Sequence, residues 1–168
     1  QLTETIREYP DFPKKGILFR DIMPILQNPD LFSELISEMS SSTLLKECEA
    51  IISIDARGFI FGSAIALLSK KPMLVARKIG KLPGDLITEK YLLEYGSNEL
   101  AIQKEPLNLY DNFVIVDDLL ATGGTVKCIE NLLARKNKKV LGLLVVIELV
   151  ELLGKSKFKF PVESILKF

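Results

Sequence analysis

Runs of consecutive apolar residues, rather than strict alternation, mark the strands that this sequence predicts. A continuous apolar run bounded by polar residues is typical of a strand buried on both faces of a parallel sheet. Behind such a run, apolar residues recur at helical spacing, as at Val126, Ile129 and Leu132. Strands alternating with helices predict an α/β fold, with a central parallel sheet flanked by helices and joined by right-handed crossovers. The five predicted strands cover residues 50–54, 72–76, 113–116, 140–147 and 161–168.

The N-terminal segment does not follow this alternation. Residues 2–9 predict a short helical turn, and the proline, glycine and lysine content of residues 10–16 indicates a loop. We expect residues 1–27 to form a small hood over the strand ends.

A second exception is the polar segment 82–104, which has glycines as pivots. Its short alternating stretches, residues 91–94 and 100–103, predict a two-stranded ribbon that turns at residues 96–98. No repeat or linker interrupts the sequence, so residues 1–168 are expected to form a single domain.

Composition narrows the range of functions. Lysine plus arginine equals aspartate plus glutamate at 22 each, so no global basic field favours nucleic acid or an anionic membrane. No apolar run reaches the roughly 20 residues needed to cross a bilayer. Two cysteines without metal-ligand spacing suit a cytoplasmic protein with reduced thiols. Histidine is absent, so proton transfer must use a carboxylate, lysine or tyrosine.

The main candidate site follows the apolar run 113–116. Two carboxylates, Asp117 and Asp118, come first, and a short loop with two glycines, residues 121–125, precedes a predicted helix. Glycines let successive N–H groups curl around an anion, and a helix N-terminus also favours negative charge. Carboxylates repel phosphate, so they should contact hydroxyl groups or a cation of the same ligand. A sugar phosphate fits this pattern, and no lysine follows Gly124 as a Walker A loop requires.

Two other predicted strands also end in charged residues. Arg57 follows the strand 50–54, and three cations, Arg77, Lys78 and Lys81, follow the strand 72–76. Ligands of open α/β sheets bind beyond the carboxyl ends of the strands, so these cations could meet a second anion. A solvated sheet edge is the alternative for the group at 77–81.

The motif VIVDDLLATGGT, residues 114–125, resembles the phosphoribosyl pyrophosphate motif of type I phosphoribosyltransferases. The wider chain resembles the adenine-specific members of that family. The supporting segments are YPDFPKKGILFRDIMPIL (9–26), DARGFIFG (55–62), ARKIGKLPG (76–84) and LEYG (93–96), in family order. The resemblance implies a type I phosphoribosyltransferase fold, with a five-stranded parallel sheet and the hood, and it implies that residues 82–104 are a mobile flap.

The resemblance also implies roles for individual residues. Phe19 would stack on adenine, the loop 121–125 would hold the 5-phosphate, and Glu94 would act as the base when the flap closes. Catalytic roles are implied for Glu94, Arg77, Asp117 and Asp118. Substrate contacts are implied for Leu18, Phe19, Arg20, Asp55, Ala56, Arg57, Arg77, Lys78, Lys81, Tyr95, Asp117, Asp118, Leu119, Ala121, Thr122, Gly123, Gly124 and Thr125.

Further implications concern geometry and partners. In the family, the corresponding loop often has a non-proline cis peptide bond, so the resemblance predicts one between Asp55 and Ala56. Many relatives have a glycine at the position of Ser53. Mg²⁺ would be held through substrate and water, with no direct protein ligand, and the protein would be a homodimer. Its substrates would be adenine and phosphoribosyl pyrophosphate, and its products AMP and pyrophosphate, with no nucleic acid or membrane partner.

Alternatives remain open from the sequence. The enzyme could act on another purine base, or the fold could be a catalytically inactive sensor of nucleotides or phosphoribosyl pyrophosphate. A purely structural domain would leave the glycine loop and the acid pair unexplained. Without the resemblance, the residues themselves favour a core role for Phe19, and Glu94 and Tyr95 could be plain surface residues.

The adjacent positions of Asp117 and Asp118 raise a geometric difficulty. Successive side chains of a regular strand point to opposite faces, so Asp117 and Asp118 can share one ligand only if the strand ends or twists there.

Overall fold

The sheet of the computed structural model, which describes residues 2–92 and 97–168, places five parallel strands side by side. In spatial order these are β4 (Met73–Lys78), β3 (Ala50–Ile54), β7 (Asn112–Leu120), β8 (Lys139–Glu148) and β9 (Val162–Lys167). All four neighbouring pairs are parallel. The predicted five-stranded parallel sheet is therefore confirmed.

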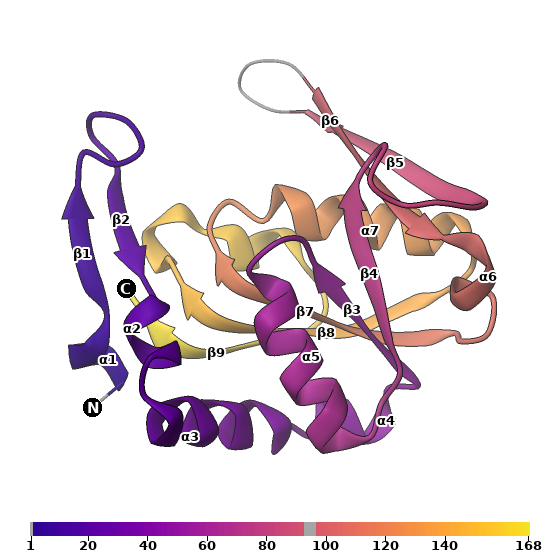
Figure 1. The fold of residues 1–168 in the computed structure, drawn as a ribbon. Coiled ribbons are helices and arrows are strands. Elements are labelled where there is room, and N and C mark those ends of the chain that lie inside the picture. Colours follow the sequence, from indigo (N-terminus) through magenta and orange to yellow (C-terminus); the bar gives the residue numbers. More distant parts are fainter. Residues whose placement is uncertain (1, 93–96) are drawn as a thin grey trace.

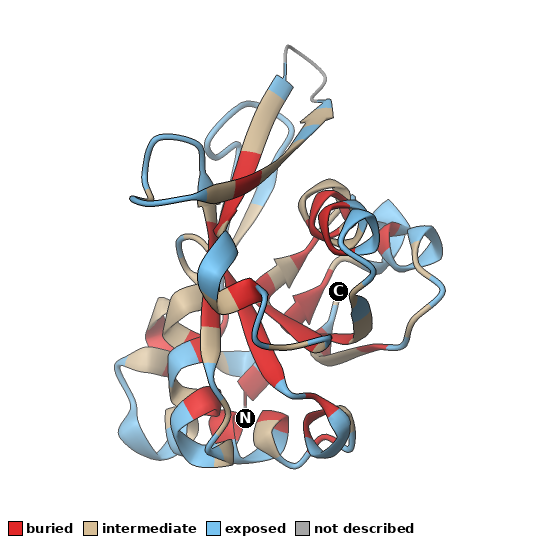
Figure 2. Ribbon diagram, turned by 90° about the vertical axis from the view of Figure 1, so that its right-hand side faces the viewer, coloured by how far each residue is buried: buried red, intermediate tan, exposed pale blue. Residues whose placement is uncertain are grey.

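Helices cover both faces of this sheet. Helices α3 (Pro29–Ser40) and α5 (Gly58–Ser69) lie on one face, and α7 (Gly124–Arg135) lies on the other (Figure 1). Burial alternates accordingly, because Val114 and Val116 pack with the α3–α5 core whereas Phe113 and Ile115 pack with the α7 core. The strand interior is thus buried on both sides (Figure 2), which explains its continuous apolar sequence.

Strand β7 is longer than the apolar run that predicted it. The prediction ended the strand at Val116, but β7 continues through the two acids to Leu120. Its neighbour β8 is long enough to pair throughout, with Leu119 opposite Ile147 and Leu120 opposite Glu148. Pairing with β8 therefore extends the strand past the point at which hydrophobicity stops.

The predicted flap is part of the main sheet. Strands β5 (Leu86–Leu92) and β6 (Ser97–Gln103) form an antiparallel hairpin, and β6 also pairs with Arg77 and Lys78 of β4. The predicted turn at 96–98 was wrong for Ser97 and Asn98, which pair with Leu92 and Tyr91. The strands also begin earlier than predicted, at Leu86 and Ser97, and the added part of β5 includes the buried core residue Ile87.

The hood is a small separate sheet. Helix α1 (Leu2–Thr5) precedes β1 (Arg7–Pro10), which pairs antiparallel with β2 (Leu18–Asp21) before α2 (Met23–Leu26). The helical turn predicted over residues 2–9 was too long, since it ends at Thr5 and pairing with β2 takes over. Figure 1 shows the hood and the flap rising on opposite sides of the carboxyl edge of the parallel strands.

Short helices complete the fold. Among them are α4 (Leu44–Glu47), α6 (Lys104–Leu107) and two 3₁₀ turns, Val150–Leu152 and Gly154–Lys157. Within the described residues, no helix is long and apolar enough to cross a membrane.

Candidate active site

The glycine loop joins the end of β7 to the start of α7. Gly123 has φ +80°, a left-handed conformation that favours glycine. A Cβ at this position would lie 2.9 Å from the Phe158 ring and 3.1 Å from the Gly154 carbonyl oxygen. The loop therefore packs closely on the segment 154–158, while its other side borders a cavity of about 340 Å³. The cavity is lined by Tyr91, Leu92, Asp117, Leu119, Leu120, Ala121, Thr122, Gly123, Gly124, Thr125 and Val126.

A second cavity, of about 440 Å³, lies at the ends of β3 and β4. Tyr91, Asp117 and Thr125 line both cavities. The second one is lined by Ile54, Asp55, Ala56, Arg57, Lys78, Lys81, Tyr91, Leu100, Asp117, Asp118 and Thr125. The carboxyl edge of the sheet thus brings a glycine loop, an acid pair and three cations to adjoining spaces.

The two acids share the second cavity although the strand neither ends nor breaks between them. Asp118 is buried, and one of its oxygens lies 2.8 Å from Nε of Arg57. An oxygen of Asp117 accepts a hydrogen bond of 2.8 Å from the Asp118 amide. The two side chains therefore do not diverge to separate sites, and both acids stay in the candidate site.

The electrostatic setting of the two carboxylates differs. Burial raises the pKa of Asp117 well above its ordinary value, and the neighbouring charge of Asp118 raises it further. The guanidinium of Arg57 acts in the opposite direction on the pKa of Asp117. The helix α5 can approach Asp117 this closely because Gly58 has no side chain. A Cβ at Gly58 would lie 2.9 Å from an Asp117 oxygen.

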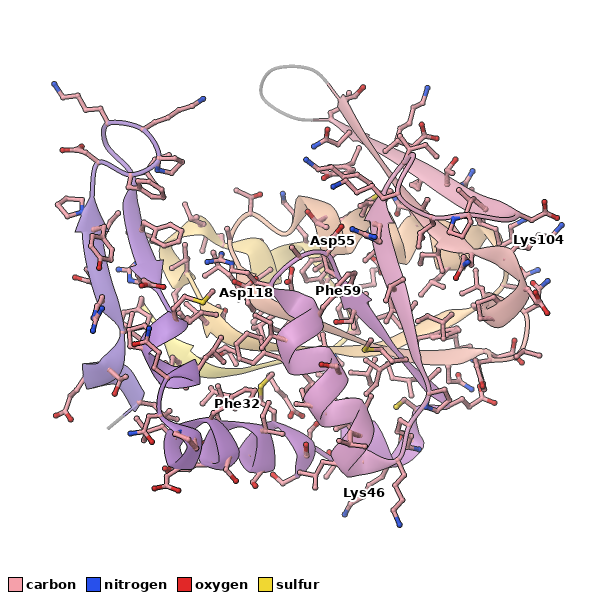
Figure 3. The ribbon with its side chains drawn as sticks, viewed as in Figure 1. Phe32, Lys46, Asp55, Phe59, Lys104 and Asp118 are labelled. Atoms are coloured by element: carbon pink, nitrogen blue, oxygen red, sulfur yellow. The ribbon has the colours of Figure 1, made fainter. Side chains whose placement is uncertain are left out.

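The cations are not equivalent. Arg57, Lys78 and Lys81 line the second cavity. The side chain of Arg77 instead donates to an Asp55 oxygen at 2.8 Å and to the Lys81 carbonyl at 3.3 Å. Its guanidinium also lies 5.8 Å from the centre of the Phe59 ring. Figure 3 shows Asp55, Phe59 and Asp118 gathered at the carboxyl edge of the sheet, between hood and flap.

The loop after β3 has the predicted cis peptide bond between Asp55 and Ala56. Ser53 is completely buried, and its hydroxyl donates to the Gly58 carbonyl at 2.7 Å. A Cβ at Gly62 would lie 2.1 Å from the Ser53 hydroxyl oxygen, so the absence of a side chain there makes room for the hydroxyl. The serine thus ties β3 to the first turn of α5.

The hood contributes an aromatic ring to the site. Phe19, half-buried on β2, has the Arg57 guanidinium 5.4 Å from its centre and the Phe12 ring edge-on at 5.2 Å. Arg20 points elsewhere, 3.3 Å from a Glu8 oxygen and 4.6 Å from the centre of the Phe168 ring. Leu18 is exposed on the same strand.

Comparisons with known proteins agree with this geometry. The model of the phosphoribosyl transferase domain family matches residues 25–161. The adenine phosphoribosyltransferase of Prochlorococcus marinus strain MIT 9515 is 61% identical over 168 residues, which cover 100% of this chain and 98% of the relative. That of Mycoplasmopsis pulmonis is 44% identical over 99% of this chain and 97% of its own length.

The chain belongs to the adenine phosphoribosyltransferases.

Solved adenine phosphoribosyltransferases share its fold. The structure from Thermoanaerobacter pseudethanolicus superposes with a TM-score of 0.91 at 37% identity, covering 99% of this chain and 98% of the other. The Saccharomyces cerevisiae enzyme, solved with D-2,5-dideoxy-2,5-imino-altritol 1,6-bisphosphate and adenine, gives 0.88 at 36% identity, with 98% and 96% covered. The fold is therefore that of type I phosphoribosyltransferases.

Some residues that build this phosphoribosyltransferase site were given no role in it by the sequence analysis. Tyr91 lines both cavities, Ser53 supports the loop after β3, and Phe158 packs on Gly123. Only Tyr91 had a usable signal, as the aromatic residue of an alternating stretch beside the predicted flap tip. Glu94 and Tyr95, predicted as base and substrate contact, lie outside the described residues.

The donor set also bears on a metal. Within the described parts of the chain, no group of three or more histidine, cysteine, aspartate or glutamate side chains could hold a metal ion. Asp118 and Asp55 already face arginines. Mg²⁺ generally keeps several waters and binds through substrate oxygens, and its binding here stays a prediction.

Proposed function

We propose that this adenine phosphoribosyltransferase transfers the phosphoribosyl group of phosphoribosyl pyrophosphate to adenine, giving AMP and pyrophosphate in purine salvage. The observation that carries the proposal is the carboxyl edge of the sheet, where an anion loop, two carboxylates and three cations border adjoining cavities. This edge matches a ligand with a phosphate at one end, a diol in the middle and a pyrophosphate at the other.

Each part of the donor has a complementary part of the site. Backbone N–H groups of residues 121–125, the first turn of α7 and the Thr122 and Thr125 hydroxyls suit the 5-phosphate. Asp117 and Asp118 suit the ribose hydroxyls. Arg57, Lys78 and Lys81 suit the pyrophosphate, and Arg77 would reach it either in its own site or across a dimer interface.

The reaction follows from this arrangement. The bond between C1 of the ribose and pyrophosphate breaks, a ring nitrogen of adenine bonds to C1 from the opposite face, and adenine loses a proton. Positive charge grows on the ribose beside the two acids, while negative charge grows on pyrophosphate beside the cations. Preset charges of this kind stabilise a transition state without a covalent intermediate. Bound Mg²⁺ would neutralise further charge on the leaving group.

The purine would lie under the hood. The Phe19 ring offers an aromatic face, and the backbone around Leu18 and Arg20 offers donors and acceptors for the edge of adenine. Glu94 would take the proton when the flap closes, and Tyr95 would join it at the flap tip. Closure would keep water from the reactive sugar. Support for adenine comes from the yeast relative, which was solved with adenine.

Two further features belong to the proposal. We place the enzyme in the cytoplasm, since its two cysteines, both buried, form no disulfide with each other. We also propose a homodimer, on the resemblance to the family alone.

A coupled assay of pyrophosphate release tests the proposal. The protein is supplied with phosphoribosyl pyrophosphate, Mg²⁺ and one base at a time: adenine, hypoxanthine, guanine or xanthine. We expect release with adenine alone. Release with a 6-oxopurine in place of adenine would favour the rival purine specificity. No release with any base, combined with binding of the donor, would favour an inactive sensor.

A further inference from the structure

Tyr91 lies where the two cavities of the site meet, and it lines both. It is half-buried on β5, within the hairpin and outside the flap tip, and its ring packs against the core cluster that includes α7. Its position is held by this core contact and by Asn98, which pairs with it across the hairpin. The residue therefore belongs to the wall of the site in the structure as it stands.

The hydrogen-bonding state of the Tyr91 hydroxyl is informative. Nδ2 of Asn98 donates to this oxygen at 3.4 Å, a long contact that uses the oxygen as an acceptor. Throughout residues 2–92 and 97–168, no acceptor receives the hydroxyl hydrogen. A tyrosine hydroxyl whose oxygen accepts one bond still has one hydrogen to donate. As far as the described residues go, this hydrogen is therefore available to a ligand.

The charges around the two cavities differ, and the difference decides which end of the ligand needs this donor. The cavity at ends of β3 and β4 is lined by Arg57, Lys78 and Lys81. The cavity at the glycine loop is lined by neither lysine nor arginine among the described residues. A phosphate held there must rely on N–H and O–H donors, so one additional hydroxyl has a large relative effect.

We propose that the Tyr91 hydroxyl donates a hydrogen bond to the 5-phosphate of the phosphoribosyl ligand, and that its ring separates the 5-phosphate from the pyrophosphate cavity. The inference rests on the proposed function of the site. It assigns a substrate-binding role to a residue of the hairpin itself, in addition to the glycine loop.

The Tyr91→Phe variant removes the hydroxyl and keeps the ring. Its affinities for ribose 5-phosphate and for pyrophosphate, each with Mg²⁺, are measured separately by calorimetry. We expect ribose 5-phosphate to bind about tenfold more weakly, because a hydrogen bond to a charged group is lost, and pyrophosphate to bind as in the unchanged protein. The Michaelis constant for phosphoribosyl pyrophosphate should rise in parallel, with that for adenine unchanged.

Tyr110→Phe is the matched control. Tyr110 is also half-buried and packs on the same core, with its ring 6.5 Å from that of Phe113, but it precedes the amino end of β7, away from the carboxyl edge. Both ligands should bind this variant with unchanged affinity.

A second variant guards against a folding defect in the first. Asn98→Ala removes the partner that orients the hydroxyl and should weaken ribose 5-phosphate binding by a smaller factor, again without effect on pyrophosphate. Unchanged ribose 5-phosphate binding in Tyr91→Phe, or a loss confined to pyrophosphate, would overturn the inference. Neither result touches the proposed function, which fails only if the unchanged protein releases no pyrophosphate from its donor in the presence of adenine.

Discussion

At the scale of single residues, the ion pair between Asp118 and Arg57 links two parts of the site that the sequence keeps apart. Asp118 lies within the motif 114–125 on β7, and Arg57 lies in the loop after β3, yet their side chains meet at 2.8 Å. The opposite charge of the guanidinium offsets part of the cost of burying the carboxylate. In the proposed reaction, both groups then face the charges of one ligand.

Asp118→Asn should reduce turnover by about 100-fold, the effect of removing one preset charge from a transition state. Asparagine has nearly the same shape, so the melting temperature should change little. Steady-state rates with adenine, together with thermal unfolding, measure both effects. Asp111→Asn is the control, since that carboxylate is exposed and pairs with Lys138. Near-normal turnover in Asp118→Asn would remove the residue from the site.

The raised pKa of Asp117 leads to a prediction about how the stability of the fold depends on pH. Burial raises its pKa, so the native protein keeps this proton at pH values at which the unfolded chain, with a pKa near the usual value of about 3.9, has released it. Stability contributed by the protonated form therefore decreases as pH rises through the raised pKa.

Asp117→Asn removes this titration and can still accept the hydrogen bond from the Asp118 amide. Its melting temperature should match that of the unchanged protein near pH 4 and exceed it at pH 8. Melting curves across this range give the comparison, with Asp85→Asn, an exposed position, as the reference. Equal melting temperatures at every pH would show that Asp117 is not destabilised by its surroundings.

Glu94→Gln tests the proposed base, which lies outside the described residues. We expect turnover to decrease by about 100-fold because the proton acceptor is lost, with smaller changes in the Michaelis constants. Rates measured over a range of pH also test the role, since the limb that reports the base should disappear. Unchanged turnover would end this assignment.

At this scale, the sequence revealed residues whose type is itself the signal. The acid pair, the glycines and the cations after strand ends could be found because carboxylates, glycines and lysines in those places are unusual. Ser53 and Phe158 could not be found in this way. Their roles depend on contacts with Gly58 and Gly123, which only the fold brings together.

At the scale of elements, the glycine loop depends on a segment about 30 residues further along the chain. A Cβ on Gly154 would lie 2.2 Å from the Ala121 carbonyl oxygen, and Phe158 closes on Gly123 from the same side. The loop therefore has a rigid support on one side and the cavity on the other. Its backbone can present N–H groups to a phosphate without a large rearrangement.

Gly154→Ala and Gly124→Ala should separate support from binding. The first forces a methyl group against a carbonyl, so it should destabilise the fold by about 1–3 kcal/mol. The second meets nothing within 4 Å and lies in the first turn of α7, so it should change stability by less than about 1 kcal/mol. Because Gly124 lines the cavity, its variant should bind ribose 5-phosphate more weakly. Denaturant unfolding measures the stability of each variant, and calorimetry measures its affinity for ribose 5-phosphate. An unchanged stability of Gly154→Ala would contradict the proposed support of the loop by Gly154.

The predictability of the elements follows their burial. Strand β3 was predicted with the bounds it has, because every residue of it is buried. The hairpin was predicted too short, because one side of β5 is exposed and its pairing with β6 depends on the rest of the sheet. Strand β7 was predicted too short for a related reason, since its last residues are held by β8 rather than by their own hydrophobicity.

At the scale of the whole molecule, the site is assembled from nearly the full length of the chain. The hood supplies Phe19, the carboxyl edge of the parallel strands supplies the cations and acids, and the hairpin supplies Tyr91. Net charge is zero, so attraction of the anionic donor must come from local groups at the carboxyl edge rather than from an overall field. The purine and the phosphoribosyl donor are thus bound by different elements in the proposed reaction.

This division predicts separable footprints in hydrogen exchange. Ribose 5-phosphate contacts the loop 121–125 and Tyr91 in our account, so it should slow exchange there and in β5, but not in the hood strands. Adenine, added in the presence of pyrophosphate, should slow exchange in β2 around Phe19. Helix α3 lies below the sheet, away from both cavities, and its exchange should not change (Figure 1). Protection of the glycine loop by adenine alone would mean that the purine occupies the position assigned to the phosphate. The hood would then need another function, because its aromatic ring would have no ligand to stack on.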